Sequence, residues 1–560
     1  MKKIAALALC ALLGAGLVTS GSQAKQAHLG KVRYTVLTRA SVSPARARAS
    51  LKSLGARIVG SNNRIGLTTV VAEGAFVSRA METGVFRGVA RDRIVGRAPQ
   101  DLHKPALTTR PSVRSAPFRA AHHLGEDTLW RYQWHLRQVN AGPTSSYDIQ
   151  QGDSRVLVGI MDTGIDARHR DVAGNLDREL SRNFTQDIPS VDGKCKREPD
   201  RSCEDTALVD EDGHGTWTAT TVAGARNGVG VSGVAPSVTL VNLRAGQDSG
   251  YFFLQPTVDA LTYAGDNGID VVNMSFFVDP WLYNCTDNPA DSPEAQLEQQ
   301  TIIEAMGRAL DYAHDRGVTM VSAMGNEWTD IGDPEVDEIS PDFPPEAPYK
   351  RDIDNSCVTL PTEGEHVIAV GGTGPSGRKS WLSNYGLEQT EVAAPSGDSF
   401  DNALPYPYNM ALSAWSTSGI RKYGLVNRKG KPNTPEVIRR CSKKAKPQCS
   451  YYMFAEGTSM SSPIAAGVAA LIVSQFGSDD GDGGLTMDPD QVEAILESSA
   501  QQHPCPEGGV QRYPEIGNAL SDFGFQAEDF TATCEEGEGD FNGFYGNGIV
   551  DAMKALESSL

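Results

Sequence analysis

Five short apolar runs, separated by stretches of helical composition, limit the folds available to this sequence. The first run is continuously apolar, and the other four are similar with one or two polar residues each, which is typical of strands buried on both faces of a sheet. The runs span 156–161, 238–243, 269–274, 318–323 and 366–370, and helices are expected at 256–266 and 297–315. Strands that alternate with helices form parallel sheets, because the helices carry the chain back. The sequence therefore predicts an α/β fold with a doubly wound, mainly parallel sheet.

A smaller unit is expected ahead of this sheet, in residues 25–98. Its segments follow the order β-α-β-β-α-β, which matches a ferredoxin-like α+β domain. The strand-like segments are 33–39, 57–60, 65–72 and 88–95, and the helix-like segments are 44–54 and 75–82. Residues 99–126 follow as a linker, which begins with a stretch rich in Pro, Ser, Thr and Arg. The main domain is expected over 127–560, with irregular insertions at 279–296, 327–360 and 399–455.

The distribution of charged residues marks the same division between a front segment and the main domain. Residues 25–120 contain 18 Lys or Arg and four Asp or Glu, a net charge of +14, whereas the whole chain carries −19. A basic front segment and an acidic body are expected to attract each other. The alternative explanation is that this difference in charge reflects only compositional drift in an acidic secreted protein. The overall acidity argues against a nucleic-acid-binding protein, which needs a basic surface.

The first 24 residues have the pattern of a secretory signal. Two lysines follow Met1, an apolar run covers 4–18, and small residues at 22–24 form a cleavage site. The run is shorter than the about 20 apolar residues that a membrane span needs, and no later run is long enough. The sequence therefore predicts a secreted protein, extracellular or periplasmic, with no stable membrane insertion.

Because an exported protein enters an oxidising compartment, its cysteine content indicates whether disulfides form. Nine are present, and removing the signal would leave eight in an oxidising compartment, which favours disulfides. Close spacing suggests the pairs Cys195–Cys203 and Cys441–Cys449, and the pairing of the other four stays open. Zinc binding is a weaker explanation of the cysteines than disulfides, because the sequence has no CxxC or HExxH pattern.

Three Gly-bounded motifs place an Asp, a His and a Ser at turns. Asp162 lies in Ile-Met-Asp-Thr-Gly, directly after a predicted strand, where α/β sheets place their ligand sites. His214 lies in Asp-Gly-His-Gly-Thr, and Ser459 lies in Gly-Thr-Ser-Met-Ser-Ser-Pro at the start of an apolar helix. The free N–H groups at a helix start favour a developing negative charge. A serine needs a base to take its proton, so His214 would be that base and Asp162 would orient it.

These motifs resemble those of the subtilases, the subtilisin-like serine peptidases, which share the order Asp-His-Ser. The strings at 271–275, 321–327, 383–386, 392–395 and 545–552 are also similar to family motifs. The resemblance implies an endopeptidase that cleaves peptides or proteins through an acyl-enzyme, with the side chain of Asn326 in the oxyanion hole. It also implies a self-processing zymogen, with residues 25–98 as its own inhibitory and chaperoning propeptide, a processing site within 99–126, and a monomeric product.

The walls of the expected cleft depart from the family pattern. After Ser275 the family usually has Leu-Gly-Gly, which leaves the edge open for a substrate strand. This chain has Phe276 and Phe277 instead, and Met324 replaces a small residue before the oxyanion turn. These bulky residues predict a restricted cleft. Asp212 stands where the family often has Asn, so either it favours a basic residue in the substrate or it is a solvated turn residue.

Calcium is the cofactor that the resemblance implies. Asp171 corresponds to the family's carboxylate ligand, and Asn227 falls in a loop with the length and Gly pattern of the family's calcium loop. Carbonyl oxygens of Ala225, Val229 and Val231 would complete the all-oxygen shell that Ca²⁺ prefers. The ligand that the family takes from the mature N-terminus cannot be aligned.

Two other functions remain open at this point. A selective processing peptidase, as opposed to a nutritional scavenger, is compatible with the altered substrate edge and the long insertions. A catalytically inactive peptide-binding protein is opposed by the intact set of Asp162, His214, Asn326 and Ser459.

Overall fold

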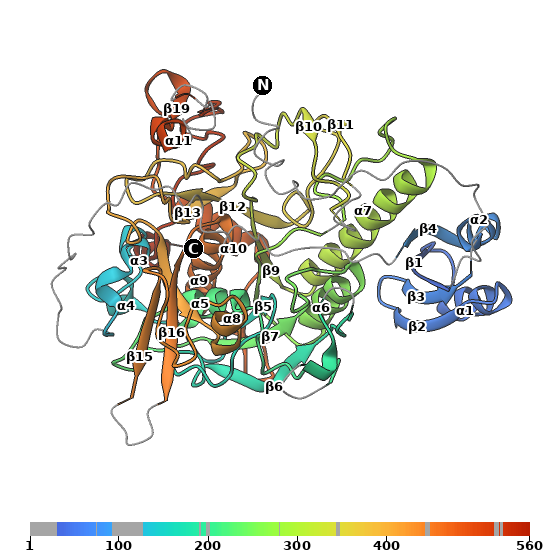
Figure 1. Ribbon diagram of the computed structural model, residues 1–560, viewed down its shortest axis with the longest axis horizontal. Helices are drawn as coiled ribbons and strands as arrows, with labels where there is room; N and C mark the ends of the chain where they lie inside the picture. Colours follow the sequence, from blue (N-terminus) through green and yellow to red (C-terminus); the bar gives the residue numbers. More distant parts are fainter. Residues whose placement is uncertain are drawn as a thin grey trace.

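The computed structural model describes ten ranges of the chain: 31–73, 75–91, 127–189, 192–197, 202–278, 280–342, 348–442, 448–519, residue 526 and 530–559. The predicted signal (1–24) and the whole of the predicted linker (99–126) lie outside them. Figure 1 shows a small domain beside helices α6 and α7 of a much larger one.

The small domain has the predicted β-α-β-β-α-β order. Its four strands form an antiparallel sheet in the order β2-β3-β1-β4, which is the ferredoxin-like arrangement. The elements are β1 (Val32–Thr38), α1 (Pro44–Ser53), β2 (Arg57–Asn62), β3 (Leu67–Ala72), α2 (Phe76–Glu82) and β4 (Phe86–Arg91). Val36, Leu51 and Phe76 are fully buried between the helices and the sheet.

The large domain is built on a seven-stranded parallel sheet, which confirms the predicted fold class. The strand order is β13-β12-β9-β8-β5-β7-β6, and every pairing is parallel. The strands are β5 (Leu157–Met161), β6 (Leu176–Asn183), β7 (Thr239–Arg244), β8 (Val271–Met274), β9 (Thr319–Ala323), β12 (Val367–Thr373) and β13 (Val392–Pro395). All five predicted apolar runs form strands, and β6 and β13 extend the sheet at its two edges.

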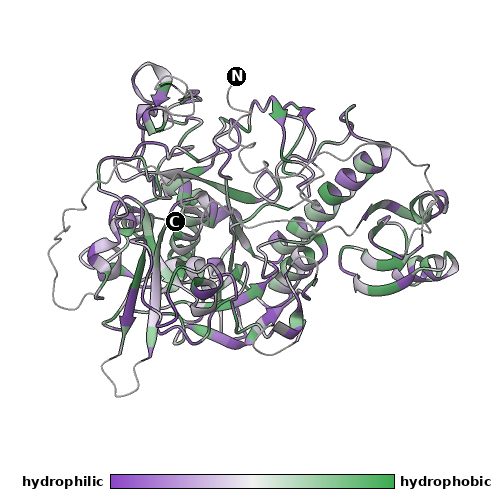
Figure 2. Ribbon diagram, in the orientation of Figure 1, coloured by the Kyte–Doolittle hydropathy of each residue, from purple (hydrophilic) through white to green (hydrophobic). Residues whose placement is uncertain are grey.

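Helices cover both faces of this sheet because its strands are apolar on both sides. Along β5, Val158 and Ile160 pack with helices α5 and α9, whereas Met161 packs with α6 and α7. The helices are α5 (His214–Ala223), α6 (Leu254–Asp266), α7 (Pro293–His314), α9 (Thr458–Phe476), α10 (Pro489–Ser498) and α12 (Ala552–Glu557). Figure 2 shows hydrophilic and hydrophobic residues alternating around α7, as expected of a helix with one buried face.

Helix α9 is buried in this core. Among the described residues it is the one helix with the length and hydropathy of a membrane span, but 83% of its most apolar stretch is buried inside the fold. The hydropathy of α9 is therefore explained by its place in the core.

The predicted insertions contain more structure than expected. The segment 399–455 was expected to be irregular, but it forms helix α8 and an antiparallel sheet in the order β14-β16-β15. Its elements are β14 (Ala411–Trp415), α8 (Thr417–Lys422), β15 (Val437–Cys441) and β16 (Cys449–Ala455). The remaining short elements are α3 (Trp134–Gln138), α4 (Ser146–Ile149), β10 (Val336–Asp337), β11 (Arg351–Asp352), β17 (Ser478–Asp479), β18 (Leu485–Thr486), β19 (Val510–Arg512), α11 (Pro514–Ala519) and β20 (Thr531–Thr533).

Four disulfides join all eight cysteines after Cys10. Cys195–Cys203 and Cys441–Cys449 form as their spacing suggested. The other four cysteines, whose pairing was open, form Cys285–Cys357 and Cys505–Cys534.

Candidate active site

The sheet changes winding direction between β5 and β8. The chain passes from β5 to β6 and β7 on one side and then returns to β8 on the other. Such a switch leaves a crevice at the carboxyl ends of the strands, where open α/β sheets bind ligands. Asp162 directly follows β5, and Ser275 directly follows β8.

His214 and Asp162 form a buried pair at this crevice. Asp162 Oδ1 lies 2.8 Å from His214 Nδ1, and Oδ2 lies 3.0 Å from the same nitrogen. The carboxylate also accepts hydrogen bonds from the N–H of Thr163 (2.7 Å) and the hydroxyl of Thr218 (3.1 Å). Its position and orientation are therefore fixed by the backbone after β5 and by helix α5.

A glycine sets the position of His214 as the first residue of α5. Gly213 precedes it with a φ of 114°, in the region that favours glycine. A Cβ at this position would lie 1.9 Å from the indole nitrogen of Trp415. A larger residue would therefore displace either Trp415 or the turn that carries His214.

The surroundings of His214 raise the pKa of its imidazole. Burial by itself lowers this pKa, but the negative charge and hydrogen bond of Asp162, with smaller contributions from Asp212 and Asp210, outweigh it. The same groups stabilise the imidazolium that forms when His214 accepts a proton.

Asp210, which the sequence reasoning missed, organises the turn before His214. It accepts hydrogen bonds from the N–H of Gly213 (2.7 Å), the N–H of Thr216 (3.0 Å) and the hydroxyl of Thr163 (3.1 Å). Burial and the nearby Asp212 raise its pKa to about 7, although hydrogen bonds from Thr216 and Gly213 oppose the shift. Its only sequence signal is an acidic residue four positions before His214.

Ser459 is the second residue of α9, on the other side of the crevice. Gly457, with a φ of 145°, forms the N-cap of this helix. The Ser459 hydroxyl donates to the carbonyl oxygen of Ser275 (3.3 Å). His214 Nε2 is buried and has no hydrogen-bond partner within the described ranges. The base nitrogen is therefore free to accept a proton, and such catalytic hydrogen bonds commonly tighten only when substrate binds.

Asn326 is held so that its amide nitrogen is available as a donor. Its Oδ1 accepts hydrogen bonds from the N–H (2.7 Å) and the hydroxyl (3.1 Å) of Thr458, the residue before Ser459. Within the part of the chain that the structure describes, neither Asn326 Nδ2 nor the Ser459 N–H has an acceptor. These are the two donors that the sequence assigned to an oxyanion hole.

The residues expected to form the cleft walls are mostly buried. Ser275 bonds to Ser462 (2.8 Å between the hydroxyl oxygens). Phe276 is 2% exposed and stacks on Phe252, with 4.0 Å between ring centroids. Met324 is fully buried in a cluster under the insertions. The phenylalanine at 277 is half-buried. The expectation that all three bulky side chains project into the cleft therefore needs correction, because the strand ends turn Phe276 and Met324 into packed clusters.

Asp212 is also buried, at 4% exposure. One carboxylate oxygen accepts the N–H of His214 (3.1 Å), and the other bonds to the hydroxyl of Tyr423 on the 399–455 insertion. Asp212 is therefore not a solvated turn residue, and its selection of a basic substrate residue stays a prediction.

The predicted calcium residues lie together away from this crevice. Asp171 is fully buried, and its Oδ2 accepts the N–H of Val231 (3.0 Å) while Asn227 Nδ2 lies 3.4 Å from its Oδ1. Asp127, which the sequence reasoning missed, bonds to the N–H of Gly228 in the same loop (2.6 Å). Burial raises the pKa of both the Asp171 and the Asp127 carboxyl. An all-oxygen set of two buried carboxylates fits a hard cation such as Ca²⁺.

The fold and the site define a class of protein. A buried Asp–His pair, a serine at a helix start and two hydrogen-bond donors without an acceptor among the described residues, at the switch point of a parallel sheet, are the groups of a serine hydrolase.

The comparisons with known proteins place the chain within this class. Residues 153–548 match the subtilase family, and the chain belongs to that family. It is 25% identical over 385 residues to the nisin leader peptide-processing serine protease NisP of Lactococcus lactis subsp. lactis, an alignment of 68% of this chain and 49% of that protein. It is 26% identical to subtilisin DY of Bacillus licheniformis, over 62% of this chain and 84% of that one.

A solved structure shows the same fold. The crystal structure of the epidermin leader peptide processing serine protease EpiP from Staphylococcus aureus superposes with a TM-score of 0.60 and 18% identity, covering 94% of this chain and 98% of that chain. The predicted fold class and family are thereby confirmed. The alignment with NisP spans only about half of that relative.

Proposed function

We propose that this chain is a secreted serine endopeptidase, made as a zymogen, that hydrolyses peptide bonds through an acyl-enzyme. The observation that carries the proposal is the buried His214–Asp162 pair, in which Nε2 of His214 has no hydrogen-bond partner among the described residues, together with Ser459 as the second residue of α9. Family membership supports the same reaction.

Each group then has a distinct role. His214 Nε2 takes the proton of Ser459 Oγ as that oxygen bonds to the substrate carbonyl carbon. The oxyanion that forms accepts hydrogen bonds from Asn326 Nδ2 and the Ser459 N–H. When the C–N bond breaks, His214 returns the proton to the leaving amine. Asp162 stabilises the imidazolium that exists between these two proton transfers. Water then attacks the acyl-enzyme by the same steps, with His214 again as the base.

Residues 25–98, of which the structure describes 31–73 and 75–91, are proposed to be the propeptide. Asn62 Nδ2 donates to Asp259 (2.9 Å) and Thr262 (2.7 Å) on α6. Arg308 on α7 donates to the carbonyl oxygens of Thr38 (2.9 Å) and Ile65 (3.0 Å). Such contacts suit a domain that stabilises α6 and α7 during folding, and the processing site would follow within 99–126.

Charge supports this pairing of the two domains. Basic side chains of the small domain face acidic side chains of α6 and α7 in three pairs: Arg64–Asp266, Arg87–Glu304 and Arg91–Glu294. Exposed pairs of this kind contribute only about 0–1 kcal/mol each. They favour the orientation and rate of association more than its strength, which suits a domain that is later released.

Calcium is proposed as a structural cofactor at the 225–231 loop. Asp171 and Asp127 would supply carboxylate oxygens, Asn227 its side-chain oxygen, and Ala225, Val229 and Val231 their carbonyl oxygens. The ion would neutralise two buried carboxylates and join the loop to the segment around residue 127.

Calcium removal is expected to destabilise the fold. Chelation by EGTA should lower the thermal unfolding midpoint of Ser459→Ala, a background without self-digestion, by roughly 3–4 °C, because an ion bound far above its Kd stabilises by about 3–4 kcal/mol and the unfolding entropy of a chain this long is about 1 kcal/mol per kelvin. Calorimetry would measure the shift. Asp171→Asn should abolish the effect of EGTA, whereas Asp148→Asn, an exposed control, should keep it. An equal effect of EGTA on both variants would show that the ion binds elsewhere.

Covalent labelling tests the proposed function directly. A serine-directed fluorophosphonate should modify Ser459 of the processed protein, because only an activated serine reacts at a useful rate. Peptide mass mapping would locate the label. His214→Ala should lose the label, and Ser461→Ala, a neighbouring buried serine in α9, should retain it. No label on the processed wild type, or a label elsewhere, would rule out the proposed nucleophile.

A selective processing role is the second candidate. NisP and EpiP are both named as leader peptide-processing proteases, and this chain resembles both. The half-buried Phe277 and the structured 399–455 insertion, which reaches Asp212 through Tyr423, offer surfaces for such selection. Strong preference for one sequence in a peptide library would favour this role over general digestion.

A further inference from the structure

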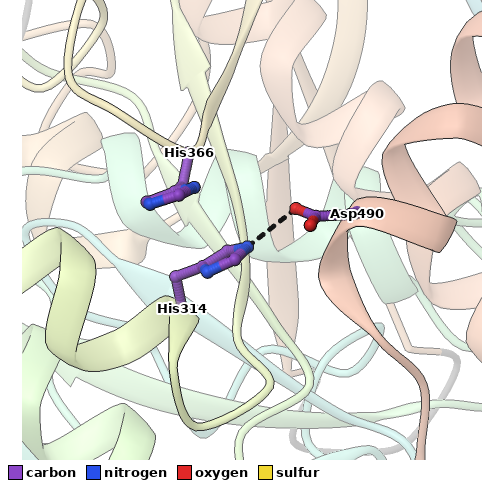
Figure 3. Close-up of side chains that lie close together, drawn as sticks. All are labelled: His314, His366 and Asp490. Atoms are coloured by element: carbon purple, nitrogen blue, oxygen red, sulfur yellow. Dashed lines mark hydrogen bonds and ion pairs between the residues drawn. The ribbon is translucent and has the colours of Figure 1, made fainter.

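A cluster of two histidines and a carboxylate lies outside the site described above. His314 is the last residue of α7, His366 directly precedes β12, and Asp490 is the second residue of α10. Figure 3 shows the two imidazoles stacked with Asp490 beside them. The ring centroids are 3.8 Å apart, His314 Nε2 lies 2.9 Å from Asp490 Oδ1, and one potential ligand atom from each residue lies within 4.8 Å of the other two.

We propose that these three residues bind a first-row transition-metal dication, Zn²⁺ in the first instance. Two imidazole nitrogens and one carboxylate oxygen form a ligand set that zinc accepts in a tetrahedral site, with water as the fourth ligand. The site is open to solvent, since His366 is 37% exposed and Asp490 is 72% exposed at their side chains. A cation can therefore enter without opening the fold.

The surroundings of the cluster favour a cation. His314 ends α7, and the carbonyl end of a helix attracts positive charge. Asp311 Oδ1 lies 3.8 Å from Nε2 of His366, which is longer than a hydrogen bond, and adds negative charge beside this ring. Glu493, one turn further along α10, adds negative charge close to both rings.

The backbone at His366 is also unusual. Its φ is 65°, in the left-handed region that only a few per cent of residues other than Gly adopt, with Asn, Asp and His more often than the rest. The ring of His366 lies face to face with that of His314, and the two rings would tilt for one nitrogen of each to meet at a common ion.

The position of the cluster in the sheet indicates that it has no part in catalysis. His366 precedes β12, and His314 precedes β9 by a short turn, so both lie at the amino ends of their strands. Asn326 follows the carboxyl end of β9, on the opposite edge of the sheet. The metal would therefore join α7, β12 and α10 and stabilise the fold, without taking part in peptide hydrolysis.

Direct binding measurements would test this site. In full-length Ser459→Ala, titration calorimetry with ZnCl₂ should show one site with an affinity on the order of micromolar. His314→Gln and His366→Asn should each weaken binding about 100-fold, because each removes one of three protein ligands. Asn tolerates the left-handed backbone at 366, and circular dichroism would confirm folding. His503→Gln, which removes a histidine outside the cluster, should bind zinc like the parent.

Thermal unfolding gives a second readout. Zinc at about 100-fold above its Kd should raise the unfolding midpoint by roughly 2–3 °C, and His314→Gln and His366→Asn should lose this rise while still responding to calcium. Cobalt should give the visible absorption of a tetrahedral site in the parent alone. No zinc binding at tens of micromolar, or equal binding by the parent and both cluster variants, would overturn the proposal.

Discussion

Replacing Ser459 with alanine is expected to lower peptide hydrolysis by about 10⁶-fold and to leave the exported chain joined to its N-terminal domain. A loss of this size follows removal of the nucleophile in a subtilisin. The physical reason is that His214 then has no hydroxyl to deprotonate, so no acyl-enzyme can form. Asn326 and the Ser459 N–H would remain, so a small residual rate over water is expected.

Intact mass and N-terminal sequencing of the exported wild type and Ser459→Ala would measure this outcome. Wild type should lose the small domain with a cut within 99–126, and the variant should keep it. Ser461→Ala is the matched control, since this serine is buried two residues further along α9 and, among the described residues, bonds to the carbonyl oxygens of Thr458 (2.8 Å) and Val370 (3.4 Å) alone. If Ser459→Ala is processed like the wild type, another peptidase matures this chain and the self-processing proposal fails.

Most of the fold and the site's motifs could be predicted because they are encoded locally. The apolar runs that became β5, β7, β8, β9 and β12 owe their character to burial on both faces, which composition alone reveals. Asp162, His214, Asn326 and Ser459 each lie in a short string whose glycines fix one turn. Cys441 and Cys449 could be paired because they lie close in sequence, and the structure places them opposite each other on β15 and β16.

The missed features depend on contacts between distant segments. Asp127 accepts a hydrogen bond from the 225–231 loop, and Asp210 accepts one from Thr163 in addition to those from its own turn. A single acidic residue carries no signal of such distant partners. Phe276 was expected at the cleft, but the direction of its side chain depends on where β8 ends and on the position of Phe252. The strands of 399–455 were hidden because the segment between β14 and β15 contains several Pro, Gly and Lys residues and resembles an irregular loop.

Replacing Asp162 with asparagine is expected to lower kcat by about 10⁴-fold while the fold is retained. A loss of this size follows the same change in a serine protease of another fold. Both carboxylate oxygens lie within 3.0 Å of His214 Nδ1. An asparagine would place an NH₂ group at one of them, which favours the tautomer that carries its proton on Nε2. His214 could then no longer accept the Ser459 proton, and its imidazolium would lose a negative partner.

The same substitution should also change the pH dependence of the reaction. The active form needs neutral His214, so the acid limb of kcat/KM reports the pKa of His214 in the free enzyme. Asp162 raises this pKa by its charge and hydrogen bond, so Asp162→Asn should move the acid limb to lower pH. Thr218→Val, which removes one hydrogen bond to Asp162 and no charge, should lower kcat by no more than about 10-fold and leave the limb near its original position. Steady-state rates on a peptide substrate across the acid limb would measure both. An unmoved limb, or one displaced to higher pH, would mean that Asp162 does not set the protonation of His214.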